Sequence, residues 1–146
     1  MIVRLVLMVP VLIRAVYTDM RDGKIENRLV LAAFISGVFL VGATGGAAGL
    51  FTGVKMAFIM TAALLVLFMI GGLGAGDIKL MAVISLCFPK QCVMMVITAF
   101  LIAGVIAIFK MLFRAVKRER IYIRGETIHF SIPILISFGV VMIFVR

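Results

Sequence analysis

Residues 91–112 read QCVMMVITAFLIAGVIAIFKML, and Lys110 is the only charged residue among them. A run of about 20 apolar residues is long enough to cross a bilayer as an α-helix. The same character extends over the whole chain, because 65% of its 146 residues are apolar, 14% are charged and the mean hydropathy is +1.32. A water-soluble domain of this size could not bury so much apolar surface. The composition therefore predicts a membrane protein and leaves no room for a separate soluble catalytic domain.

Glycine, proline and charge divide the chain into apolar segments. We expect six of them, at residues 2–17, 29–43, 48–70, 77–88, 91–112 and 129–145. The fourth is short for a full crossing. The predicted fold is all-α, with residues 1–146 forming one membrane-embedded domain, a bundle of about six transmembrane helices. Because Arg14 interrupts the first run and no small-residue cleavage site follows it, we expect this segment to be retained as the first helix.

The basic residues divide unequally between the connections that join these segments. Eleven lie on or near the first, third and fifth connections: Arg14, Arg21, Lys24, Arg28, Lys79, Lys110, Arg114, Lys117, Arg118, Arg120 and Arg124. Only Arg4, Lys55, Lys90 and Arg146 remain for the other face. By the positive-inside rule, the odd-numbered connections face the cytoplasm and both termini lie outside. The net charge of +9 then reflects topology, and we expect the basic residues to meet anionic lipid headgroups and no nucleic acid.

All six carboxylates fall on the same three connections: Asp19, Asp22, Glu26, Asp77, Glu119 and Glu126. Asp19 and Asp77 differ from the others because each lies at the boundary of a predicted span, Asp19 just after the first and Asp77 at the start of the fourth. Both can therefore reach the same depth near the inner leaflet. An ionisable group at membrane depth is a functional candidate, whereas we expect the other four to balance nearby bases in solvated loops.

Asp77 ends a glycine-rich stretch, since residues 71–77 read GGLGAGD. Glycine permits unusual backbone angles and close approach by another chain, so Gly74 and Gly76 are candidate contacts for a substrate strand. Alternatively, Asp77 simply caps the helix that begins at Ile78, and the glycines serve helix packing. The local pattern favours neither interpretation.

Two facing carboxylates in a poorly solvated place cannot both ionise readily, so we expect one of Asp19 and Asp77 to be protonated near neutral pH. The ionised member can take a proton from water while the protonated one polarises a peptide carbonyl, as in aspartic proteolysis. The single histidine, His129, has no serine or cysteine partner at a recognisable spacing, and we expect it to be interfacial. Cys87 and Cys92 form no Cys-x-x-Cys pair, so we expect no metal site and two free thiols, with a disulfide across the intervening turn as the alternative.

The run Gly74-Ala75-Gly76-Asp77-Ile78-Lys79-Leu80, with Asp19 six residues before Ile25 and eight before Asn27, resembles the type IV prepilin peptidases. These are polytopic aspartic peptidases that carry a Gly-x-Gly-Asp motif. The resemblance covers nearly the whole chain. It implies that Asp19 and Asp77 are the catalytic aspartates and that no cofactor is needed. The implied reaction removes the short basic leader from prepilins or pseudopilins at the cytoplasmic face of the inner membrane.

Some features depart from the family pattern. Glu26 stands where the family often has proline, and residues 131–133 only weakly echo a proline-containing family segment. The chain lacks the insert with two Cys-x-x-Cys pairs that accompanies methyltransferase activity in the longer members. It therefore resembles the short, peptidase-only members that serve Flp/Tad pili, and we expect no methyl transfer.

Two other functions compete with the peptidase. In a small proton-coupled transporter or channel component, Asp19 and Asp77 would relay ions, and further polar groups would be spread across the membrane depth. A non-catalytic membrane scaffold would use its glycines to bind partner helices and would tolerate replacement of both aspartates. A peptidase requires the two carboxyl groups to approach each other in the fold.

Overall fold

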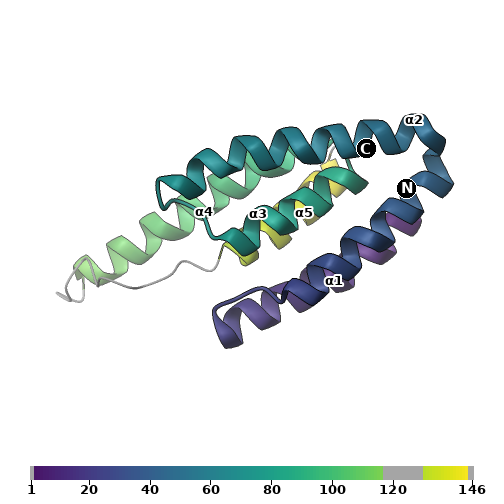
Figure 1. The fold of residues 1–146 in the computed structure, drawn as a ribbon. Helices are drawn as coiled ribbons and strands as arrows, with labels where there is room; N and C mark the ends of the chain where they lie inside the picture. The colour runs from purple at the N-terminus through teal and green to yellow at the C-terminus, as the bar shows by residue number, and fades with distance from the viewer. Residues whose placement is uncertain (1, 117–129, 145–146) are drawn as a thin grey trace.

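The computed structural model describes residues 2–116 and 130–144, and these residues form five helices. The helices are α1 (Ile2–Asp22), α2 (Asn27–Met69), α3 (Ala75–Cys87), α4 (Cys92–Val116) and α5 (Ser131–Phe144). Figure 1 shows them arranged as an elongated bundle, which confirms the predicted all-α class. Glu119, Glu126, His129 and most of the basic cluster before them lie outside the described residues.

Helix α2 contains both the second and the third expected segment. A straight helix of its 43 residues would be about 65 Å long, roughly twice the hydrocarbon thickness of a bilayer. Gly46 interrupts it with φ 61° and ψ −164°, a combination that is essentially confined to glycine. The loop expected between the second and third segments is therefore wrong: the chain kinks there at one residue, and the neighbouring glycines remain helical.

The ends of α1 and α3 differ from the expected boundaries in a way that matters for the two aspartates. The mostly polar residues 18–22 continue α1, which stops at Gly23. There φ is +64° and the backbone N–H donates to the carbonyl oxygen of Asp19 at 2.9 Å. Asp19 thus lies in the last turn of the helix and not after it. The N-cap of α3 is Gly74, so the interpretation of Asp77 as the cap is wrong, and Asp77 belongs to the first turn.

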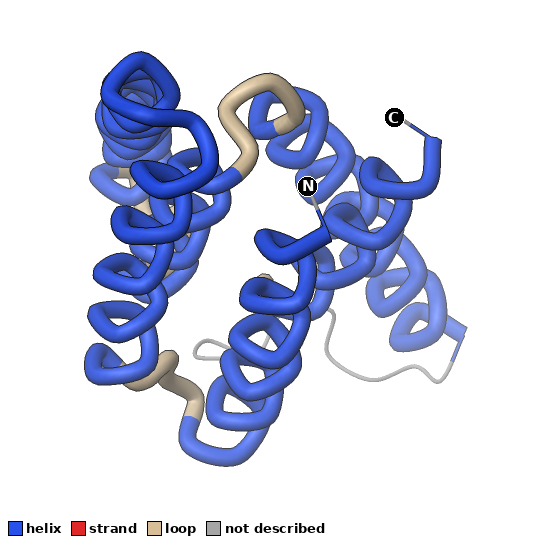
Figure 2. Tube along the Cα trace, turned by 90° about the vertical axis from the view of Figure 1, so that its right-hand side faces the viewer, coloured by secondary structure: helices blue, strands red, loops and turns tan. Residues whose placement is uncertain are grey.

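Helix α3 lies inside the bundle. Nine of its 13 residues are buried, from Asp77 and Ile78 near its start to Leu86 and Cys87 at its end. Figures 1 and 2 show α2, α4 and α5 around it. The second half of α2 approaches so closely that a Cβ at Gly53 would lie 2.5 Å from the carbonyl oxygen of Leu86. This enclosure explains how such a short apolar segment is accommodated.

The outer surface of the bundle is apolar. Phe39, Phe58 and Phe109, on α2 and α4, are each more than 70% exposed. Within the described part of the chain, Asn27–Met69 and Cys92–Phe113 are long and apolar enough to cross a membrane, and only 22% of the most apolar window of each is buried. Core helices of soluble proteins are mostly buried, so this surface is suited to contact with lipid.

The two ends of the bundle carry different elements. Helix α1 begins and α5 ends at one end, near the kink of α2 (Figure 1). There the guanidinium of Arg4 donates to the carbonyl oxygen of Cys87 at 3.0 Å and to Oγ1 of Thr44 at 2.7 Å. The opposite end holds the loop between α1 and α2 and the starts of α3 and α5. Asp19 and Asp77 lie at this second end.

Cys87 and Cys92 are free cysteines, and both are buried. The Cys92 thiol donates to the carbonyl oxygen of Pro89 at 3.1 Å, within the turn that joins α3 to α4.

The Gly46 kink predicts the effect of an added side chain. Gly46→Ala should destabilise the protein by about 1–3 kcal/mol, because a side chain strains this backbone conformation. Gly42→Ala is the matched control, since residue 42 is helical and a Cβ there meets nothing within 4 Å. Thermal unfolding of both variants in detergent tests this, and an equal or higher melting temperature for Gly46→Ala would contradict it.

Candidate active site

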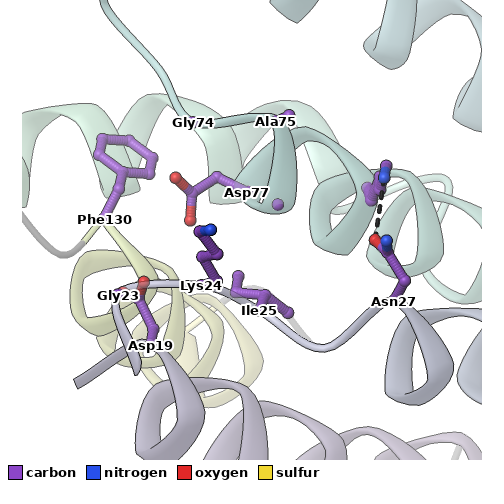
Figure 3. Close-up of a pocket in the computed structure, with 11 residues that line it drawn as sticks. Asp19, Gly23, Lys24, Ile25, Asn27, Gly74, Ala75, Asp77 and Phe130 are labelled. Carbon is purple, nitrogen blue, oxygen red and sulfur yellow. Dashed lines mark hydrogen bonds between the residues drawn. The ribbon is translucent and has the colours of Figure 1, made fainter. Parts of the chain in front are cut away.

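A cavity of about 370 Å³ lies at the end of the bundle where α1 ends and α3 and α5 begin. Asp19 lines it from α1, residues 23–25 from the following loop, residues 74–77 from the start of α3, and Phe130 from the residue before α5. The two aspartates singled out in the sequence therefore share one cavity although they come from separate helices. Figure 3 shows both side chains directed into it.

Asp77 sits in the first turn of α3 and is 8% exposed. The N-terminus of a helix carries partial positive charge, which stabilises a carboxylate there. A Cβ at Gly74 would lie only 2.8 Å from Oδ2 of Asp77, so the missing side chain leaves room for this carboxyl group. In Figure 3 the carboxyl group points into the cavity beside Phe130.

Asp19 is half-buried in the last turn of α1. Ser131, the first residue of α5, is fully buried, and its hydroxyl donates to Oδ2 of Asp19 at 2.6 Å. The bond fixes one oxygen of Asp19 and ties α5 to the cavity. In the sequence, Ser131 stands out only as part of a proline-containing segment, because a single hydroxyl before an apolar helix is a weak signal.

The loop between α1 and α2 packs closely on the start of α3. A Cβ at Gly76 would lie 3.1 Å from the Cβ of Ile25, which is itself buried. The absence of a side chain at residue 76 lets this loop, and with it the last turn of α1, lie over the turn that carries Asp77. The close packing of this loop explains why residue 76 is a glycine. Gly74 is exposed and lines the cavity, so it keeps a surface that another chain could reach.

Two lysines also line the cavity, and both are exposed. Lys24 points toward Asp77 in Figure 3, whereas the ammonium of Lys79 donates to Oδ1 of Asn27 at 3.0 Å. None of the described residues that line the cavity is a serine, cysteine or histidine. Among the described side chains, no group of three or more metal-ligating residues occurs. The chemistry that this lining offers is proton transfer between carboxyl groups and water.

The neighbouring acids Asp22 and Glu26 do not line the cavity. Glu26 lies 3.7 Å from the guanidinium of Arg14, and Asp22 lies 4.0 Å from that of Arg21, and all four side chains are well exposed. Exposed pairs of this kind contribute little to stability. The expectation that these two acids balance neighbouring bases is confirmed.

Comparison with known proteins gives one match. The sequence profile of the type IV leader peptidase family matches residues 6–109. This range contains Asp19, the loop between α1 and α2, and residues 74–77, but not Ser131. Neither a curated protein nor a solved structure matches the chain.

The contact between Gly76 and Ile25 predicts a measurable coupling. Gly76→Val should destabilise the protein by about 1–3 kcal/mol, because the larger side chain overpacks against Ile25. Adding Ile25→Ala should restore part of this loss, since the two positions touch. Gly104→Val is the control, because a Cβ there meets nothing within 4 Å. Thermal unfolding of the single and double variants measures the coupling, and strictly additive effects would contradict the contact.

Proposed function

Because the chain belongs to the type IV leader peptidase family, whose profile spans residues 6–109 of its 146, we propose that it is a membrane aspartic endopeptidase. Its substrates are prepilin-like or pseudopilin chains, from which it removes the basic leader. The observation that carries the proposal is the cavity that Asp19 and Asp77 share. A non-catalytic scaffold has no need for two carboxyl groups in one cavity, and a proton-coupled transporter would need further polar groups spread across the membrane depth.

The proposed chemistry divides one reaction between the two aspartates. The ionised carboxylate takes a proton from a water molecule, and the resulting hydroxyl oxygen attacks the carbonyl carbon of the scissile peptide bond. The other aspartate, protonated, gives its proton toward the carbonyl oxygen as that oxygen gains charge. When the tetrahedral intermediate collapses, the bond from carbon to nitrogen breaks, the first aspartate gives its proton to the leaving amine, and the second takes back the hydroxyl proton as the carbonyl re-forms. No metal or cofactor enters this scheme.

The proposed orientation puts the cavity at the cytoplasmic face of the inner membrane and both termini on the other side, with about six crossings. It is supported by the charge distribution of the sequence and by the two halves of α2, which supply a second and a third crossing. It is also supported by the fact that α1 begins and α5 ends at the end of the bundle away from the cavity (Figure 1). The leader would then reach the cavity that Asp19 and Asp77 share from the cytoplasm. We expect leader cleavage without methyl transfer.

Substitution of the aspartates tests the catalytic assignment directly. Asp19→Asn and Asp77→Asn should each lower the rate of leader removal from a co-expressed prepilin by at least about a hundredfold, because an amide can neither accept nor supply the transferred proton. Glu26→Gln is the control and should change the rate far less, since Glu26 only pairs with Arg14 outside the cavity. A shift in prepilin size on immunoblots measures processing. Normal processing by either aspartate variant would refute the assignment.

Ser131 supplies a second test, because it acts on the reaction through Asp19. Ser131→Ala should slow leader removal, and Ser131→Thr, which keeps a hydroxyl group, should restore much of the rate. Ser137→Ala is the matched control: Ser137 is equally buried in α5, but its hydroxyl bonds to the carbonyl oxygen of Ile134. Both alanine variants should lose similar stability, on the order of 1 kcal/mol. Equal activity of the two alanine variants would show that the bond to Asp19 has no part in the reaction.

A further inference from the structure

A second cavity, of about 360 Å³, adjoins the first between α2 and α3. Asn27 and Lys79 line both cavities, and the hydrogen bond between their side chains, 3.0 Å long, lies where the two meet. The remaining lining is apolar and consists of Val30, Leu31, Phe34 and Ala82. The lining therefore changes from polar to apolar with distance from Asp19 and Asp77. The hydrogen-bonded pair of Asn27 and Lys79 lies at the point of change. We call this second cavity the α2–α3 groove.

The groove exists because the first half of α2 and α3 are in contact at one end and separate at the other. A Cβ at Gly37 would lie 3.0 Å from the Sγ of Cys87, at the end of α3 that is far from the aspartates. One to two turns nearer the aspartates, Phe34, Leu31 and Val30 line open space opposite Ala82. At a rise of 1.5 Å per residue, the groove extends about 10 Å along α2 from Asn27 to Phe34. It extends along α2 away from the aspartate cavity.

We propose that the α2–α3 groove binds the apolar segment of the substrate that directly follows the cleaved bond. The proposal rests on the proposed function and deepens it by assigning a docking surface to one part of the substrate. A substrate chain whose bond is held in the aspartate cavity must extend beyond that cavity. The cavity is continuous with the α2–α3 groove through Asn27 and Lys79. Polar groups beside the bond and apolar side chains beyond it match a substrate whose basic leader precedes an apolar helix.

The junction between the two cavities has a chemistry suited to this passage. The first N–H and last C=O groups of a helix have no partner within it, and a strand presented for cleavage has none either. Leaving such groups unpaired in an apolar place is costly. The amide of Asn27 and the ammonium of Lys79 can exchange their mutual bond for bonds to the substrate backbone. Leu31 is 61% exposed, so the groove is open to the outside of α2, and an apolar helix can enter it from the bilayer.

A larger apolar cavity, of about 780 Å³, lies between α1 and α2, but it does not suit this role. Its lining runs from Val3 to Val11 on α1 and from Ser36 to Ala43 on α2, and it shares no residue with the aspartate cavity. A segment docked there would not be continuous with a peptide bond held between Asp19 and Asp77. The α2–α3 groove is the cavity that meets this requirement.

Disulfide cross-linking tests the docking without relying on cleavage. Leu31→Cys in the full-length Asp77→Asn protein is co-expressed with a prepilin-like probe that carries a cysteine in its apolar segment, near the bond. After oxidation of the membranes, Leu31→Cys should form a cross-linked product and Leu65→Cys should not, because Leu65 is exposed on the other half of α2 and lines neither cavity. Absence of the product at residue 31, or equal amounts at both positions, overturns the proposal.

A cleavage experiment separates the groove from the catalytic assignment. Two probes are used with the full-length protein, one with the whole apolar segment and one truncated shortly after the bond. Ala82→Phe, which fills the groove, should lower the ratio of whole-probe to truncated-probe cleavage by roughly tenfold, the effect expected for loss of an apolar anchor. Ala63→Phe, on an exposed face of α2, should leave the ratio unchanged. An unchanged ratio for Ala82→Phe overturns the groove alone, whereas no cleavage of either probe by the native protein overturns the proposed function.

Discussion

Enclosure of α3 is the constraint on which the rest of this fold depends. A helix of 13 residues is about 20 Å long, too short to cross a bilayer while facing lipid along its length. This short helix can be accommodated here because the other helices surround it and bury nine of its residues. Gly53 allows α2 to approach the α3 backbone, and Gly76 allows the loop before α2 to cover its first turn. The cavity forms at that first turn because the surrounding elements also end there.

The charges at the two ends of α3 complement its dipole. Asp77 lies in the first turn, where the peptide dipoles place positive charge, and Arg4 donates to the carbonyl oxygen of Cys87, the last residue of the helix. The C-terminal carbonyl groups of a helix have no partner within it, so this guanidinium satisfies one that is otherwise buried with Cys87. Arg4 also bonds to Thr44 beside the kink of α2. Arg4, one of the few basic residues predicted for the sparsely charged face, therefore has a structural role.

Sequence patterns predicted the features that follow from composition, namely the helices and the two aspartates. They missed the features that depend on individual backbone angles or on contacts between residues distant in sequence. Apolar runs located the helices, and charge placement singled out Asp19 and Asp77. The end of α1 was misplaced because the apolar run stops before the helix does, and only Gly23 ends the helix. Gly46 could not be told apart from its glycine neighbours, which remain helical. The contacts of Ser131 with Asp19 and of Ile25 with Gly76 join distant parts of the chain, and no local pattern reports them.

The proposed hydrolysis of a bond beside an apolar helix would make opposing demands, because the reaction consumes water whereas the apolar segment of the substrate prefers lipid. The two cavities would separate these demands in space. The aspartate cavity is bounded by exposed lysines and lies at the end of the bundle where charged residues gather, so water can reach Asp19 and Asp77. The α2–α3 groove has an almost wholly apolar lining and opens along a helix long and apolar enough to cross the membrane. The bond between Asn27 and Lys79 marks the boundary. A substrate lying across this boundary would keep its apolar segment away from water while its scissile bond is accessible to water. Neither cavity alone offers both conditions.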